Sequence, residues 1–335
     1  MQATSPAAGD KQRIMTLDAP LLRIGTRGSP LALAQAEAVR ARLAAAFAEL
    51  AAPDAIAIVV IRTTGDAITD RTLAAIGGKG LFTKEIEQAL LDGAIDLAVH
   101  SMKDVPTFQP DGLIVDSFLP REDPRDAFFA RGGADLDTLP AGSVVGTASL
   151  RRQAQILSAR PDLRVVPFRG NVETRLKKLE DGVVDATLLA VAGLKRLGQA
   201  ARIGTVLTPE QMLPAVAQGA IGLERRVADS RVERYLAALN DQPTLIRVSA
   251  ERALLASLDG SCKTPIAALA EFQPDGRLRL RALVVRPDGS ERHATERLGA
   301  AADAERLGHD AGAELRRHAG PGFFDLTPPP EEPAR

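Results

Sequence analysis

The chain has 335 residues, of which 45% are hydrophobic and 25% are charged, and its formal net charge is −1. At roughly 100–200 residues per domain this length suggests two or three domains, with the composition of an ordinary globular protein. The near-zero charge and only 3% aromatic residues argue against a nucleic-acid binder. The single cysteine excludes a disulfide framework within the chain, and the histidines lack metal-ligand spacing such as HExxH, so no metal is predicted.

The two ends of the chain, residues 1–19 and 326–335, are expected to be flexible tails. The first lacks the apolar segment of a signal peptide, and the last is too polar and proline-rich to pack into a core. The most apolar stretch, residues 43–61, is interrupted by charges and a proline, so it does not supply the ~20 apolar residues of a membrane-spanning helix. We therefore expect a cytoplasmic protein that does not contact a membrane.

The first half of the chain predicts alternating strands and helices. The apolar strand LLRIGTR is followed by the helix SPLALAQAEAVRARL and by a second strand in AIAIVVIRTTGD, residues 55–66. Further on, EIEQALLDGAIDLAVHS predicts a helix, a glycine turn and a buried strand. Between these units lies a glycine-rich segment that could act as a lid: Gly77, Gly78, Lys79 and Gly80.

The middle of the chain repeats this pattern. SVVGTAS predicts a strand and turn, LRRQAQILSAR a helix, RVVPFRGN a strand, and TRLKKLEDGVVDATLLA a helix, a glycine turn and a strand. Strands alternating with helices predict an α/β fold with mostly parallel sheets, here as two similar lobes facing a ligand cleft. From about Asn240 the pattern changes to a strand, a hairpin and a helix, which predicts a small α+β domain.

Each lobe contains the same turn, in which a strand passes through Gly-Thr and a serine into a helix. The two turns are Ile24-Gly25-Thr26-Arg27-Gly28-Ser29 and Val145-Gly146-Thr147-Ala148-Ser149. A helix N-terminus capped by serine or threonine can bind an anion. Capping alone is the simpler explanation for one such turn, but two equivalent turns with arginines beside them favour an acidic ligand.

Cationic side chains gather where strands end or helices begin, the edge at which α/β folds bind ligands. These residues are Arg27, Lys103, Arg151, Arg152, Arg169, Arg175 and Arg196. Guanidinium groups pair with carboxylates or phosphates through two hydrogen bonds. Any one of these residues could be ordinary surface charge. As a set in a nearly neutral chain, they predict a local site for a polyanionic small molecule.

Three further residues could take part in chemistry. Asp104 follows a buried strand, where a carboxylate can stabilise positive charge or transfer a proton; a turn former or surface partner of Lys103 is the alternative. His100 fits a core or strand-end histidine better than a catalyst. Cys262 precedes Lys263, which favours the thiolate. It could be an inert thiol, a hydrolase nucleophile or an attachment point.

From about Leu22 to Leu298 the sequence resembles the porphobilinogen deaminase (hydroxymethylbilane synthase) family. The motifs are IGTRGSPLALAQ, GGKGLFTKEIE, LAVHSMKDVP, GTASLRRQAQ, FRGNVETRL, AVAGLKRLG, AVAQGAIGLE and DGSCKTPI, in the order typical of the family. One departure is Ser261, where the family often has glycine. The resemblance implies two lobes like those of type-2 periplasmic binding proteins and a small α+β C-terminal domain. It implies domain 1 at 20–119 and 220–238, domain 2 at 120–219 and domain 3 at 239–325.

The resemblance also implies a transferase of tetrapyrrole biosynthesis. It would join four porphobilinogen molecules head to tail, with loss of ammonia, on a dipyrromethane cofactor held by a thioether to Cys262; hydrolysis would release hydroxymethylbilane. Asp104 matches the catalytic carboxylate. Positions matching cofactor-binding residues are Lys103, Asp104, Thr147, Ser149, Arg151 and Arg152. Positions matching substrate-binding residues are Arg27, Ser29, Arg169, Arg175 and Arg196. The glycine-rich segment matches the mobile loop. The family suggests a monomer, with handover of product to uroporphyrinogen-III synthase.

Two other functions remain open from the residues alone. The first is a non-catalytic binding protein of the periplasmic type for an acidic ligand, which the missing export signal and Cys262 argue against. The second is a hydrolase that uses Cys262 with His100. Its cysteine would lie in a separate domain, and no third group that orients the histidine is evident.

Overall fold

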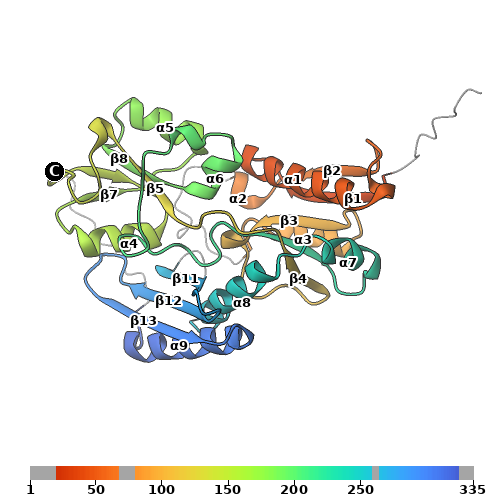
Figure 1. Ribbon diagram of the computed structural model, residues 1–335. Coiled ribbons are helices and arrows are strands. Elements are labelled where there is room, and N and C mark those ends of the chain that lie inside the picture. Colours follow the sequence, from red (N-terminus) through yellow and green to blue (C-terminus); the bar gives the residue numbers. More distant parts are fainter. Residues whose placement is uncertain (1–19, 68–79, 259–263, 324–335) are drawn as a thin grey trace, which may run out of the picture.

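The computed structural model describes residues 20–67, 80–258 and 264–323, which form two α/β lobes and a smaller third unit (Figure 1). The first sheet has the strand order β2-β1-β3-β10-β4. β1 runs parallel to β2 and β3, whereas β10 is antiparallel to both of its neighbours. The strands are β1 (Leu22–Arg27), β2 (Ile56–Ile61), β3 (Leu97–Ser101), β4 (Leu113–Phe118) and β10 (Ile221–Arg226).

Helices cover both faces of the first sheet. On one face, α1 (Pro30–Ala46) and α7 (Ser230–Ala237) pack against β1 and β10, with Val39 and Leu43 of α1 fully buried. On the other face, α3 (Lys84–Leu91) packs its apolar residues against β2 and β3. α1 begins where expected, because Ser29 caps its N-terminus and a proline occupies the first turn.

The second sheet has the order β7-β6-β8-β5-β9, in which β6 is parallel to β7 and β8 while β5 is antiparallel to β8 and β9. The two sheets therefore share one topology. The strands and helices of this lobe are β5 (Asp126–Ala130), β6 (Val144–Gly146), β7 (Arg164–Val166), β8 (Ala186–Ala190), β9 (Thr205–Val206), α4 (Leu150–Ala159), α5 (Val172–Glu180) and α6 (Val191–Arg196). The repeat extends to the turns after α3 and α5, where Gly93 and Gly182 have φ of 70° and 77°, a conformation that favours glycine.

The third unit is an antiparallel sheet of β11 (Ile266–Phe272), β12 (Leu278–Val285) and β13 (Arg292–Gly299), with α8 (Gln242–Ser257) and α9 (Ala304–Ala319) packed on one face. The core on this face continues into the first lobe through Met102 and Val105. The opposite face packs against the second lobe, where Leu283 contacts the cluster around Ala154 of α4. The third unit thus contacts both lobes, with α8 near their junction (Figure 1).

The expected fold class is confirmed: two α/β lobes with mixed, mostly parallel sheets and a small α+β unit. One detail differs, because β2 ends at Ile61 and residues Thr64–Ala67 form the short helix α2 rather than more strand. α7 and α8 were not predicted. Short 3-10 helices occur at Ala48–Leu50, Met102–Asp104, Arg131–Gly133, Ala200–Arg202 and Ala301–Asp303. Among the described helices, none has the length and apolarity needed to cross a bilayer.

Candidate functional site

A cavity of about 850 Å³ lies between the lobes and is lined by both Gly-Thr turns, by the segment after β3 and by parts of the third unit. The predicted site residues that line it are Arg27, Ser29, Lys103, Asp104, Thr147, Ser149, Arg151, Arg152, Arg169 and Arg175. Arg196 is not among its described lining residues, and neither is Gly80. Cys262, Gly77, Gly78 and Lys79 lie outside the described part of the chain.

The two turns hold the starts of α1 and α4 in the same way. The Ser29 hydroxyl oxygen accepts the Ala32 N–H at 3.3 Å, and the Ser149 hydroxyl oxygen accepts the Arg152 N–H at 3.4 Å. Thr147 Oγ1 also accepts the Ser149 N–H at 3.1 Å. These bonds fix the backbone at the beginning of each helix. The backbone that carries Arg151 and Arg152, on the first turn of α4, is therefore held in one position.

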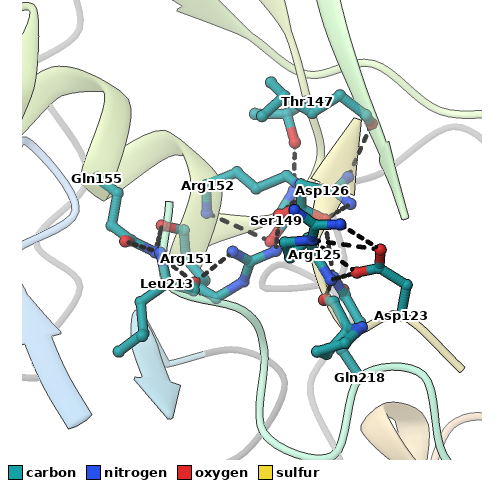
Figure 2. Close-up of polar contacts among 12 residues, drawn as sticks. Asp123, Arg125, Asp126, Thr147, Ser149, Arg151, Arg152, Gln155, Leu213 and Gln218 are labelled. Carbon is teal, nitrogen blue, oxygen red and sulfur yellow. Dashed lines mark hydrogen bonds and ion pairs between the residues drawn. The ribbon is translucent and has the colours of Figure 1, made fainter. Parts of the chain in front are cut away.

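Next to the arginines that line the second-lobe side of the cavity lies a buried carboxylate, Asp126, at the start of β5 (Figure 2). It pairs with Arg151 and with Arg152, each at 2.7 Å, and accepts a hydrogen bond from Gln218 at 2.8 Å. Burial alone would raise the pKa of Asp126, but the charges of the two arginines hold it well below its usual range. Two guanidiniums and one carboxylate leave a net positive charge facing the cavity.

The other guanidinium donors of this cluster bind backbone. Arg151 Nη1 donates to the Leu213 carbonyl at 2.7 Å, and Arg152 Nη1 donates to the Leu188 carbonyl at 2.9 Å. Burial lowers the pKa of Arg151, and the charge of Asp126 opposes this effect. The Nε of Arg151 is buried and has no hydrogen-bond partner among the residues that the structure describes. Both side chains are therefore held in place by the protein itself, while one donor remains available.

Arg175, on α5, differs from this pair because no carboxylate of the described residues pairs with it. Its hydrogen bond from Nη1 to the Leu188 carbonyl is long, at 3.5 Å, and its buried Nε has no partner in the same part of the chain. Burial lowers the pKa of Arg175 to about 10, and the charge of Arg152 acts in the same direction. A desolvated cation with an unused donor is a position that an anionic ligand would stabilise.

The first lobe contributes Lys103 and Asp104, which lie in the 3-10 turn Met102–Asp104 directly after β3. Burial lowers the pKa of Lys103; the charge of Asp104 opposes this, whereas Arg152 and Arg175 reinforce it. These mutual effects place the lysine of one lobe within electrostatic range of the arginines of the other. Asp104 is thus a carboxylate at the edge of a strongly cationic cleft.

The remaining predicted arginines have separate surroundings. The guanidinium carbon of Arg27 lies 4.1 Å from the centre of the Phe82 ring, and both residues line the cavity. Arg169 lines the cavity on the segment after β7. Arg196 Nη2 instead donates to the Gly219 carbonyl at 2.6 Å, and burial lowers its pKa to about 10. A contact of Arg196 with substrate stays a prediction.

Sequence reasoning missed the groups that organise the arginines. Asp126 is the main one, and its only signal was an acidic residue opening the apolar segment DAFFA. Gln218 and Phe82 were also missed, although both lie in motifs that the sequence analysis quoted. Both line the cavity, and Gln218 also donates a hydrogen bond to Asp126. His100 lines the cavity, but its Nε2 is 2.9 Å from the buried carboxylate of Glu224. That pairing agrees with a core histidine and offers no support for a hydrolase dyad.

A two-lobed α/β protein whose cleft carries fixed guanidiniums, with the carboxylate of Asp104 facing them, belongs to the class that binds an organic polyanion and can stabilise a cation formed on it. The sequence matches the family "Porphobilinogen deaminase, dipyromethane cofactor binding domain" over residues 22–234 and "Porphobilinogen deaminase, C-terminal domain" over residues 245–317.

Full-length relatives agree with this match. The porphobilinogen deaminase of Paracoccus denitrificans is 60% identical over 306 residues, covering 91% of this chain and 97% of that protein. The chloroplastic enzyme of Oryza sativa is 58% identical over 308 residues, covering 91% and 86%. The chain therefore belongs to the porphobilinogen deaminase family, whose members are transferases with a dipyrromethane cofactor. The expected family, enzyme class and cofactor are confirmed.

Among solved structures, the periplasmic aliphatic sulphonate binding protein SsuA from Escherichia coli is 16% identical and covers 70% of each chain, with a TM-score of 0.39. A TM-score this low adds nothing to the assignment of the two lobes, which follows from their strand orders.

Proposed function

We propose that this chain joins four porphobilinogen molecules head to tail and releases hydroxymethylbilane, with Asp104 as the catalytic carboxylate and Cys262 as the attachment point of the cofactor. The observation that carries the proposal is the cavity in which Lys103 and Asp104 of the first lobe face Arg152 and Arg175 of the second. Its charge suits a substrate with an acetate and a propionate on every pyrrole ring.

The described residues fit a dipyrromethane cofactor. Arg151 and Arg175 each have a buried Nε without a partner in the described part of the chain, and a carboxylate on the cofactor would satisfy such donors. Thr264, two positions after Cys262 in the sequence, lines the cavity. The residues proposed to hold the cofactor are Lys103, Asp104, Thr147, Ser149, Arg151 and Arg152. When bound, the cofactor supplies the pyrrole carbon to which the first substrate is joined.

Substrate binding is assigned to cations on both walls of the cavity. Arg27 and Ser29 lie on the first-lobe turn, and Arg169 and Arg175 lie on the second lobe. Arginine forks bind carboxylates through two parallel hydrogen bonds, which fixes the orientation of a ring as well as its position. Arg196 completes the proposed set and would need to exchange its bond with the Gly219 carbonyl for one with substrate.

Asp104 acts on charge that develops during the reaction. Loss of ammonia from porphobilinogen leaves a cation shared between the methylene carbon and the pyrrole nitrogen. A carboxylate oxygen close to that nitrogen stabilises this cation more than the neutral substrate, and such differential stabilisation accelerates a reaction. The same oxygen can hold the proton that leaves once the new carbon–carbon bond has formed.

The proposed domain bounds, location and partners are those that the family resemblance implies. Domain 1 comprises 20–119 and 220–238, domain 2 comprises 120–219, and domain 3 comprises 239–325. Placement of β10 in the first sheet supports the return of the chain to domain 1. We assign a cytoplasmic monomer that hands its product to uroporphyrinogen-III synthase and binds neither nucleic acid nor membrane.

Intact-protein mass spectrometry tests the proposal directly. The purified protein should carry an added mass equal to that of dipyrromethane, and Cys262→Ser should lack it and form no hydroxymethylbilane. Ser261→Ala, a change at the adjacent position, is the matched control and should keep both the added mass and the activity. An unmodified wild-type protein that still consumes porphobilinogen would overturn the attachment.

A further inference from the structure

Arg252 of α8 extends from the third unit to the segment that follows Asp104. Its guanidinium donates to three successive carbonyls: Nη1 to Val105 at 3.1 Å, and Nη2 to Pro106 at 2.6 Å and to Thr107 at 3.2 Å. The first of these carbonyls belongs to the residue next to Asp104 in the chain. A side chain from one domain thus binds the backbone beside the proposed catalytic group of another.

The contact between Arg252 and the 105–107 carbonyls is not one that would be expected to raise the stability of the fold. Burial lowers the pKa of Arg252 to about 10, and the more distant charge of Glu224 opposes that effect. Among the ion pairs of the described residues, none involves Arg252, and the printed acceptors of its guanidinium are three backbone carbonyls. The residue is half-buried, so its charge has lost part of its water. Desolvating a cation without a bonded carboxylate is costly. An apolar side chain would fill the same position at lower cost if packing were its only role.

The other flank of Asp104 is fixed independently. Met102 N–H donates to the Ala220 carbonyl at 3.1 Å, and the side chains of Met102 and Val105 pack in the same core as Leu254 of α8. Pro106 in turn restricts the backbone of Val105 to extended conformations. The position of Asp104 is then set from two sides, by the residue that precedes β10 in its own lobe and by α8 of the third unit.

We propose that Arg252 is a positioning residue that holds the 105–107 segment, so that the Asp104 carboxylate stays aligned with the reacting pyrrole. This inference rests on the role proposed for Asp104. Domain 3 would contribute to catalysis as well as carry the attachment cysteine. The arginines of the second lobe do not contact Arg252, so binding of substrate carboxylates should be unaffected by its loss.

The first test compares Arg252→Met with Arg247→Met. Methionine keeps the apolar stem and removes the donors, and Arg247 is a half-buried arginine on the same helix that donates to Pro243 and Thr244 of its own first turn. Misplacement of a catalytic group by about 1 Å can cost about a hundredfold in rate. We expect kcat of Arg252→Met to fall about ten- to a hundredfold, with KM for porphobilinogen and the cofactor mass unchanged. Arg247→Met should keep its kcat.

A second comparison separates positioning from general damage. Arg252→Lys keeps the charge and a single donor nitrogen, so kcat should lie between those of the wild type and Arg252→Met. In an Asp104→Glu background the carboxylate is already displaced, so Arg252→Met should lower kcat less than it does in the wild type. A wild-type kcat in Arg252→Lys and Arg252→Met, or equal losses in both backgrounds, would overturn the inference. If Asp104→Ala also retained turnover, the proposed role of Asp104 itself would fail.

Discussion

The two lobes are built on one plan but carry different chemistry. Both sheets have the same strand order, and in both an aspartate before the third parallel strand binds the backbone of the first strand: Asp96 accepts the Arg23 N–H and Asp185 accepts the Val144 N–H, each at 2.8 Å. Both turns place serine at the helix N-terminus. The shared features are those that specify backbone geometry.

The difference lies at the antiparallel strand of each sheet. In the second lobe, β5 begins with Asp126, which orders Arg151 and Arg152 before any ligand arrives. In the first lobe, the equivalent strand β10 carries Glu224, which binds His100 and no arginine of the cavity. The second lobe therefore presents fixed cations and the first presents Asp104. In the proposed function, the second lobe supplies carboxylate-binding arginines that are ordered in advance, and the first supplies Asp104 together with Lys103 and Arg27.

The largest expected effect follows from removing the charge on the first-lobe side. Asp104→Asn should lower the rate of hydroxymethylbilane formation by on the order of a thousandfold, because a group aimed at developing charge typically contributes that much. The thermal unfolding midpoint should stay close to that of the wild type. Asp111→Asn, at an exposed position in the following loop, is the control and should be fully active. Turnover near normal in Asp104→Asn would remove the division of roles.

On the second-lobe side the largest effect should be on stability. Asp126→Asn leaves two buried guanidiniums without a countercharge, and breaking a buried pair typically costs about 3–5 kcal/mol. Denaturant unfolding should show a loss of this size. Asp162→Asn, which removes the partner of Arg160 on the outside of the same lobe, should leave the unfolding midpoint nearly unchanged. Equal losses in both variants would mean that Asp126 does not organise the cleft.

Asp126 also predicts how stability depends on pH. Its pKa in the folded protein lies below the ordinary value of 3.8, so its contribution is complete above that pH. The contribution is lost as the pH falls below about 4, because the unfolded chain then takes up a proton that the folded protein does not. The stability difference between wild type and Asp126→Asn should therefore shrink between about pH 4 and pH 2. A constant difference across this range would contradict the ion-pair geometry.

Features with short-range signals could be predicted from the sequence, and features that depend on folding could not. The duplicated turn, the glycines after α3 and α5 and the serine–proline start of α1 were readable because each is local. Asp126 is 25 positions from Arg151 in the chain, and nothing in either segment shows that they meet. α8 escaped prediction because it packs between a sheet and a lobe, so its apolar residues do not form one stripe.

A smaller effect separates the two kinds of arginine within the second lobe. Arg175→Met should raise KM for porphobilinogen about tenfold to a hundredfold, since hydrogen bonds to charged groups contribute about 1.5–3 kcal/mol. Because burial lowers the pKa of Arg175 to about 10, its charge disfavours the folded state at neutral pH. In a cofactor-free Cys262→Ser background, Arg175→Met should therefore unfold no earlier than its parent. Arg164→Met, an exposed change on β7, should alter neither property. Loss of stability in Arg175→Met would show that this arginine braces the fold.

The smallest effects come from the matched serines, and they test the two-lobe comparison most finely. Ser29→Ala and Ser149→Ala each remove a helix cap, which typically costs about 0.5–2 kcal/mol, and the long bonds of 3.3 and 3.4 Å place both near the lower end. Denaturant unfolding should give similar losses for the pair. Their functional effects should differ, because Ser149 is assigned to the cofactor and Ser29 to the substrate: Ser149→Ala should lower the fraction of protein carrying the cofactor mass, and Ser29→Ala should raise KM. Threonine at either position retains the hydroxyl and should restore both. Identical functional profiles would mean that the two turns are equivalent in chemistry as well as in structure.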